Sequence, residues 1–222
     1  MAFKAAIFDM DGTMINSLIF WDMLWSRMGS LYLQDSTFAP SKEDDKAVRT
    51  LTMRDAMERI HRNYGIGETG EEVFLFASQM LRDFYAEEVQ LKPGVLEFLE
   101  YCRDKGIRMC VASASAQDLV SVAMEHCGLK PYFERVFSCA DLGVGKDKPD
   151  IYIQARNYLG SESTETCVFE DSLTAVETAS SLGMQTVAIY DRFNYGQERM
   201  KEIATAYIGQ GETLVRLIHD FV

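Results

Sequence analysis

Two acidic side chains one residue apart, Asp9 and Asp11, directly follow a short apolar segment near the start of the chain. The segment, residues 5–8, is predicted to be a strand, and Gly12 and Thr13 follow the acids as a turn. In an open α/β sheet, ligands bind at the carboxyl ends of the strands. Two carboxylates there could hold Mg²⁺ through oxygen ligands, and they could supply a nucleophile beside a proton-transfer group.

Two other interpretations of this segment involve no catalysis. Asp-Gly pairs are common in turns, so the acids could belong to an ordinary polar loop after a strand. Asp-x-Asp-Gly also occurs in calcium-binding loops. An EF-hand loop would continue with acids and end on a glutamate, but Ile15, Ser17 and Phe20 occupy those positions. The calcium loop is therefore excluded, whereas the enzyme and the polar turn both remain.

A second strand pattern, residues 107–112, leads to Ser113 and Ala114. A hydroxyl and backbone N–H groups at a helix N-terminus could hold a phosphate oxygen there, or Ser113 could cap the helix. Further along, Lys146 precedes a helix predicted from Pro149, where a proline suits the first turn. Its ammonium could neutralise a phosphoryl group, or it could be a solvated loop lysine.

A third strand pattern, residues 166–169, ends in a second acidic pair, Glu170 and Asp171. These acids could bind a metal together with the first pair, or they could simply favour the N-terminal dipole of the next helix.

The loop before Pro149 is no Walker phosphate-binding loop, because Ala140 and Asp147 occupy its required glycine and hydroxyl positions.

The order of these motifs resembles the haloacid dehalogenase superfamily, and within it the β-phosphoglucomutase-like branch of phosphatases with a helical cap. The resemblance covers nearly the whole chain. It implies an α/β fold, with a Rossmann-like doubly wound parallel sheet as the core and an inserted α-helical cap domain. It also implies Mg²⁺ as cofactor and a small phosphorylated metabolite as substrate.

The resemblance further implies a role for each motif residue. Asp9 would be the nucleophile that becomes an aspartyl-phosphate, and Asp11 would be the general acid and base. Ser113 and Lys146 would bind the phosphoryl oxygens. The Mg²⁺ ligands would be Asp9, the backbone carbonyl of Asp11, Glu170 and Asp171. The further substrate-binding positions would be Gly12, Thr13, Ala114 and Arg54.

The lysine motif departs from the family pattern Lys-Pro-x-Pro-Asp. This chain has Lys146-Asp147-Lys148-Pro149-Asp150. Alignment on Pro149 and Asp150 selects Lys146, whereas alignment on Lys-Pro selects Lys148. Both lysines therefore remain candidates, although the proline at the helix start favours Lys146.

Strand and helix patterns alternate along most of the chain, which is typical of βαβ units and a parallel sheet. The predicted strands are residues 5–8, 107–112, 136–137, 166–169 and 185–190. The predicted helices open at Pro93-Gly94 and cover residues 117–126, 149–158 and 173–182, with a last one that packs Leu214, Leu217, Ile218 and Phe221.

Residues 15–90 interrupt this alternation with helix patterns alone. Three apolar stripes recur at helical spacing, around Trp21 and Trp25, around Met57, and around Phe84. We therefore expect a cap of residues 15–90 inserted into a core of residues 1–14 and 91–222, placed to cover the site. Arg54 is one of six arginines in this insertion, and it could alternatively lie on a solvated helix face.

Composition narrows the class of protein. The net charge of −12 argues against a nucleic-acid-binding surface. The five cysteines form no CxxC pair, which favours buried free thiols in a reducing compartment. We find no signal-peptide pattern and no apolar run that could span a bilayer, so we expect a cytoplasmic protein with no membrane partner. We also expect a monomer.

The leading hypothesis is a Mg²⁺-dependent phosphatase that acts on a small phosphorylated metabolite, such as a sugar phosphate, through an aspartyl-phosphate. The alternative is a β-phosphoglucomutase-type isomerase, which would use the same core residues. A dehalogenase is disfavoured because the metal-type acids suit phosphoryl transfer. A signalling receiver domain is disfavoured because it has no helical insertion.

Overall fold

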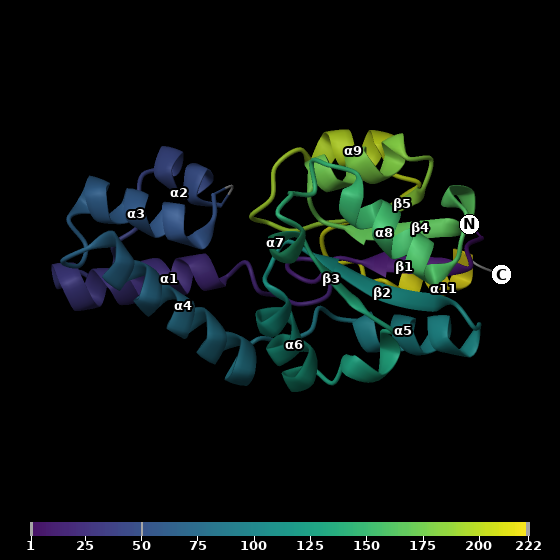
Figure 1. The fold of residues 1–222 in the computed structure, drawn as a ribbon, viewed down its shortest axis with the longest axis horizontal. Helices are drawn as coiled ribbons and strands as arrows, with labels where there is room; N and C mark the ends of the chain where they lie inside the picture. The colour runs from purple at the N-terminus through teal and green to yellow at the C-terminus, as the bar shows by residue number, and fades with distance from the viewer. Residues whose placement is uncertain (1, 50, 221–222) are drawn as a thin grey trace. The chain divides into compact units, whose positions relative to one another are not determined.

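Two compact units make up the computed structural model, which describes residues 2–49 and 51–220 (Figure 1). One unit combines Met1–Ser17 with Val89–Val222, and the other is Leu18–Glu88. The action of residues 15–90 as a cap remains a prediction.

The first unit is built on six strands that pair in parallel. They are β1 (Ala5–Phe8), β2 (Arg108–Ser113), β3 (Val136–Ser138), β4 (Thr166–Glu170), β5 (Gln185–Ile189) and β6 (Ala206–Ile208). Their order across the sheet is β3-β2-β1-β4-β5-β6. The order reverses at β1, as in doubly wound sheets, so the predicted Rossmann-like core is confirmed.

Helices follow the strands along the chain. They are α5 (Val95–Asp104), α6 (Gln117–His126), α7 (Cys139–Leu142), α8 (Asp150–Leu159), α9 (Leu173–Ser181), α10 (Gln197–Ile203) and α11 (Val215–Asp220), with the short 3₁₀ turns η2 (Lys130–Tyr132) and η3 (Ser163–Glu165). In Figure 1, α8 and α9 lie on one side of the sheet, and α5 and α11 lie on the other. The sheet is therefore covered by helices on both faces.

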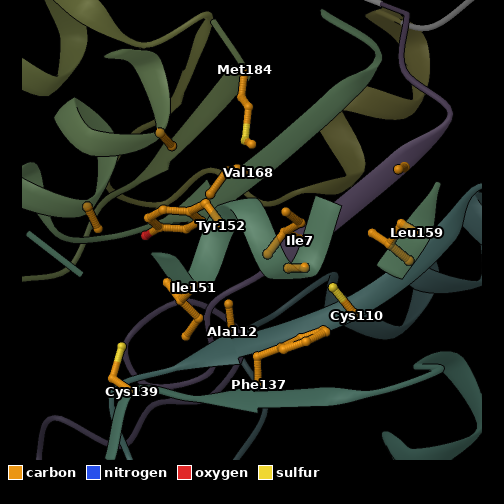
Figure 2. Close-up of a cluster of buried hydrophobic side chains, with 14 residues drawn as sticks. Ile7, Cys110, Ala112, Phe137, Cys139, Ile151, Tyr152, Leu159, Val168 and Met184 are labelled. Carbon is orange, nitrogen blue, oxygen red and sulfur yellow. The ribbon is translucent and has the colours of Figure 1, made fainter. Parts of the chain in front are cut away.

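Alternate strand residues supply the two apolar layers of this core. Ile7 and Val168 point to the α8 and α9 side, where they pack with Tyr152 in a buried cluster (Figure 2). On the other face, Phe8 stacks on Phe169 with ring centroids 4.3 Å apart, and Phe98 of α5 lies 5.3 Å from Phe169. All four residues of β1 are buried, which explains why the strand reads as a continuous apolar run.

The second unit contains helices only, among the residues that the structure describes. They are α1 (Phe20–Met28), η1 (Gly29–Leu33, a π-helix), α2 (Lys42–Val48), α3 (Met53–Tyr64) and α4 (Gly70–Glu87). The three predicted apolar stripes lie on α1, α3 and α4. Thr52 caps α3, with its hydroxyl accepting from the Asp55 amide at 3.2 Å. Trp25 is buried and Trp21 is half-buried, so both contribute to packing inside this unit.

Three details differ from the sequence-based expectations. The helix α10 and the edge strand β6 were not predicted, because both are short and β6 carries only three residues. Pro149 is the N-cap of α8 and not its first helical residue. Of the apolar residues predicted for the last helix, Phe221 lies outside the described residues.

Within residues 2–49 and 51–220, no helix combines the length and the apolar character needed to cross a membrane.

Candidate active site

The carboxyl ends of β1 and β4 bring Asp9 and Glu170 to the same edge of the sheet. Phe8 is in register with Phe169, and the Asp9 amide donates to the Phe169 carbonyl at 2.9 Å. Glu170 is the last residue of β4, so its side chain lies beside the residue that follows β1. Parallel pairing of two buried strands therefore places the two acidic motifs together.

Lys146 reaches this edge from the loop between α7 and α8. Its ammonium donates hydrogen bonds to Asp9 Oδ1 and to Glu170 Oε1. The lysine side chain is 11% exposed. Lys148, the other candidate, has a side chain that is 61% exposed, and its Nζ lies 3.6 Å from Asp147 Oδ2. Of the two lysines, the structure brings Lys146 to the carboxylates.

Asp9, Glu170 and Asp171 form a buried acidic cluster, with one carboxylate oxygen from each within 4.8 Å of the others. Three carboxylates and the single Lys146 ammonium leave two negative charges when all four groups are ionised. Glu170 Oε2 is also buried without a hydrogen-bond partner. A buried polar atom without a partner is uncommon, and coordination of this oxygen to a divalent cation would satisfy it. The residues therefore fit Mg²⁺.

Burial dominates the electrostatics of the cluster. It raises the pKa of the Glu170 carboxyl to about 7, with the Asp9 charge adding to the shift and Lys146 opposing it. Burial also raises the pKa of Asp9 and, together with the other acids, that of Asp171. Burial would lower the pKa of Lys146, but attraction to Asp9 and Glu170 raises it overall. A cation would favour the charged carboxylates.

Asp11 lies outside this cluster and is held by two serines. Its Oδ1 accepts from Ser17 Oγ at 2.7 Å, and its Oδ2 accepts from Ser115 Oγ at 2.8 Å. The predicted metal contact of Asp11 is through its backbone carbonyl, so the side-chain geometry leaves that contact a prediction. The hydroxyls of Ser17 and Ser115 hold the Asp11 carboxylate beside Asp9, where it could donate or accept a proton. Neither serine was predicted to hold it, although Ser115 lies only two residues after Ser113.

The turn after Asp11 contributes to the site through backbone geometry. Gly12 has a φ of +75°, a conformation that glycine adopts readily, and its amide donates to the Ile15 carbonyl at 3.0 Å. Thr13 Oγ1 donates to Asp171 Oδ1 at 3.0 Å. Thr13 therefore orients one of the clustered acids, whereas the substrate contacts expected of both residues remain predictions.

Ser113 ends β2 and is completely buried. Its hydroxyl oxygen accepts the Ser115 amide at 3.0 Å, which stabilises the turn into α6. Ala114, between them, is exposed. The phosphoryl contacts expected of Ser113 and Ala114 remain predictions.

Two further residues contact the clustered acids. Tyr152 of α8 is buried, and its hydroxyl donates to Glu170 Oε1 at 2.9 Å. The Asn194 side-chain amide donates to Asp171 Oδ2 and, at 3.0 Å, to the Asp171 carbonyl. Tyr152 lies two residues after Asp150 of the lysine motif, and no role was predicted for it. Asn194 belongs to none of the sequence motifs. What relates it to the site is its position in the loop after β5, the strand beside β4.

Arg54 lies in the helical unit, where its guanidinium pairs with Glu71 and stacks 4.1 Å from the Phe74 ring centroid. Its side chain is 57% exposed. The structure therefore gives Arg54, a residue of α3, two partners on α4, and its expected substrate contact remains a prediction.

Comparison with known proteins identifies a family. A family model described as a haloacid dehalogenase-like hydrolase matches residues 3–183. The chain is 24% identical to the phosphorylated carbohydrates phosphatase of Thermotoga maritima, over 95% of this chain and 96% of that protein. It is 26% identical to hexitol phosphatase B of Escherichia coli, over 83% of this chain and 82% of that protein.

Solved structures share the fold. A candidate beta-phosphoglucomutase from Thermotoga maritima superposes with a TM-score of 0.82 at 22% identity, covering 97% of this chain and 99% of that chain. CbbY from Rhodobacter sphaeroides, solved in complex with phosphate, superposes with a TM-score of 0.72 at 20% identity, covering 92% of each chain.

Proposed function

The chain belongs to the haloacid dehalogenase-like hydrolases, and from this premise we propose that it is a Mg²⁺-dependent phosphatase of a small phosphorylated carbohydrate. The observation that carries the proposal is the Lys146 ammonium bound to both Asp9 and Glu170 at the edge of the sheet. A fixed positive charge beside a carboxylate nucleophile suits phosphoryl transfer, in which catalysis is mostly positioning and charge neutralisation.

Asp9 is the proposed nucleophile. Its carboxylate attacks the phosphorus of the monoester, the bond to the sugar oxygen breaks, and an aspartyl-phosphate forms. Lys146 offsets the charge of the incoming phosphoryl oxygens while keeping Asp9 in place. Asp9, Glu170 and Asp171 would hold Mg²⁺, which would let two anions approach each other and would offset the charge that develops on the phosphoryl oxygens.

Asp11 is the proposed general acid and base. It donates a proton to the leaving sugar oxygen, and then it accepts one from the water that attacks the aspartyl-phosphate. The hydrogen bonds from Ser17 and Ser115 support this role, because they hold the Asp11 carboxylate in one orientation beside Asp9. Ser113 and the amides of the turn before α6 are the proposed ligands of the phosphoryl oxygens.

The names of two relatives support the substrate class. One is a phosphatase of phosphorylated carbohydrates and the other a hexitol phosphatase, and both align along most of this chain. The activity is tested by incubating the protein with a panel of sugar and hexitol phosphates and measuring inorganic phosphate, with Mg²⁺ or with EDTA.

We expect phosphate release with Mg²⁺ from at least one sugar or hexitol phosphate, and none with EDTA. No release from any of them would contradict the proposal. β-Glucose 1-phosphate with a bisphosphate primer separates the isomerase alternative. If glucose 6-phosphate forms faster than inorganic phosphate, the protein is a mutase and not a phosphatase.

A further inference from the structure

Asp171 is held by two neutral donors, one on each carboxylate oxygen. Thr13 Oγ1 donates to Oδ1 at 3.0 Å, and Asn194 Nδ2 donates to Oδ2. The same Asn194 amide also donates to the Asp171 carbonyl at 3.0 Å. Asn194 therefore fixes the side chain and the backbone of Asp171 together, although 23 residues separate the two in the sequence.

The loop that carries Asn194 is itself anchored. The Lys92 ammonium donates to Asp191 Oδ2 at 2.9 Å and to the Tyr190 carbonyl at 3.1 Å. The Gln197 amide donates to the carbonyls of Asp191 and Asn194, at 3.0 and 3.2 Å. Asp191 is buried and Lys92 is 17% exposed. These contacts hold the backbone of the Asn194 loop independently of Asp171.

We propose that Asn194 is a positioning residue that orients the Asp171 carboxylate for Mg²⁺, an inference that rests on the metal site of the proposed function. A carboxylate that accepts one hydrogen bond on each oxygen and is also held at its backbone has a fixed orientation, and its remaining lone pairs are available to the cation. Groups that orient metal ligands in this way typically change metal affinity by about 10–100-fold.

The chemical nature of Asn194 suits this task. An amide donates a hydrogen bond without adding charge, so the negative charge of the cluster stays available to the cation. A lysine or arginine at this position could orient Asp171 equally well, but its positive charge would repel Mg²⁺. The Lys92 ammonium is paired with Asp191 in the contact that anchors the loop.

Isothermal titration of the metal-free protein with Mg²⁺ tests the inference directly. Asn194→Ala removes the donor, and Asn194→Leu removes it while keeping the branched side-chain shape, so a second variant is at hand if the alanine unfolds the loop. Asn157→Ala is the matched control, because Asn157 is an exposed residue of α8 whose side chain accepts from Arg156. Circular dichroism and the Tm of each metal-free variant report on folding.

We expect the Kd for Mg²⁺ to rise about 10-fold or more in both Asn194 variants and to stay unchanged in Asn157→Ala. The Mg²⁺ concentration that half-activates hydrolysis of an aryl phosphate should rise in parallel, while KM for the ester at saturating Mg²⁺ should not. An unchanged Kd in a folded Asn194 variant overturns the inference. A wild-type protein that binds no Mg²⁺ overturns the metal site and the inference with it. A wild type that binds Mg²⁺ but hydrolyses no phosphate ester overturns only the proposed function.

Discussion

A single ammonium, that of Lys146, contacts the carboxylates of Asp9 and Glu170 in a largely buried position. Attraction to these acids keeps its pKa above the ordinary lysine value despite burial, so the ammonium stays charged. A phosphoryl group that approaches Asp9 would therefore meet a positive charge already in place, with no reorganisation needed. Lys148, two residues later, is mostly exposed.

This contrast predicts very different effects for two neighbouring substitutions. Lys146→Ala should lower kcat by about 10²–10³-fold, equivalent to about 3–4 kcal/mol of transition-state stabilisation. Lys148→Ala should leave kcat close to the wild-type value. Steady-state hydrolysis of an aryl phosphate measures both, with the Tm of each variant as the control for folding. If Lys146→Ala keeps a kcat close to the wild-type value and Lys148→Ala is inactive, our assignment of the active-site lysine is wrong.

The acidic pairs were predictable because each directly follows an apolar strand, and strand ends meet at one edge of a parallel sheet. The groups that hold these acids were not. Ser115 reaches Asp11 only because the turn after β1 and the turn after β2 approach each other, and Ser17 reaches it because the segment after β1 folds back on itself. Asn194 depends on the path of an irregular loop, which no periodic pattern encodes.

At the scale of elements, β1 and β4 decide the geometry of the site. Both are buried along their whole length and lie side by side in register. Their continuous apolar runs made these strands recognisable from the sequence. By contrast, β6 has three residues at the edge of the sheet, only one of them fully buried, so its pattern carried no comparable signal.

In the helical unit, Asp44 joins α2 to α3. Its carboxylate accepts from Arg59 Nε, from Asn63 Nδ2 at 3.0 Å and from Tyr64 OH at 2.6 Å. Hydrogen bonds from Tyr64 and Arg59 hold the pKa of Asp44 below its ordinary value. The segment around Asp44 is strongly polar and carries no apolar stripe. The structure shows a helix, capped by the Ser41 hydroxyl.

Asp44→Ala should therefore destabilise the helical unit by about 1.5–3 kcal/mol at pH 7, as expected for lost hydrogen bonds to a charged group. Because the pKa of Asp44 is lowered on folding, its contribution is present above pH about 4 and is lost as the pH falls through the folded pKa. The difference between wild type and variant should shrink accordingly in acid.

Urea unfolding followed by tryptophan fluorescence measures this effect, since both tryptophans, Trp21 and Trp25, lie in α1 of the same unit. Asp83→Ala is the control, because Asp83 is an exposed residue of α4 that accepts from Gln79. Equal unfolding midpoints for Asp44→Ala and wild type at pH 7 would contradict the assigned role of Asp44.

At the scale of the whole molecule, a buried cluster that has two excess negative charges when its acids are ionised opposes folding unless a cation compensates it. Mg²⁺ that binds the native state alone would stabilise it by mass action, by about 2.7 kcal/mol at 100 times Kd. We therefore predict that MgCl₂ raises the Tm of the wild type and that EDTA reverses the rise.

Two controls separate specific binding from a general salt effect. KCl at equal ionic strength should raise the Tm less than MgCl₂ does. Asp171→Asn removes one charge from the cluster, and it should reduce the Mg²⁺-dependent rise. The same Tm in MgCl₂ and KCl would argue against a resident divalent ion.

The central claim is that Asp9 carries the phosphoryl group during turnover. The direct test is to quench the reaction in acid with a phosphoryl-labelled substrate and to locate the label by peptide mass spectrometry, in wild type and in Asp9→Asn. We predict label on Asp9 in the wild type, no label in the folded variant, and turnover reduced by at least about 10³-fold. Near-normal turnover of Asp9→Asn, or label on another residue, would contradict the account.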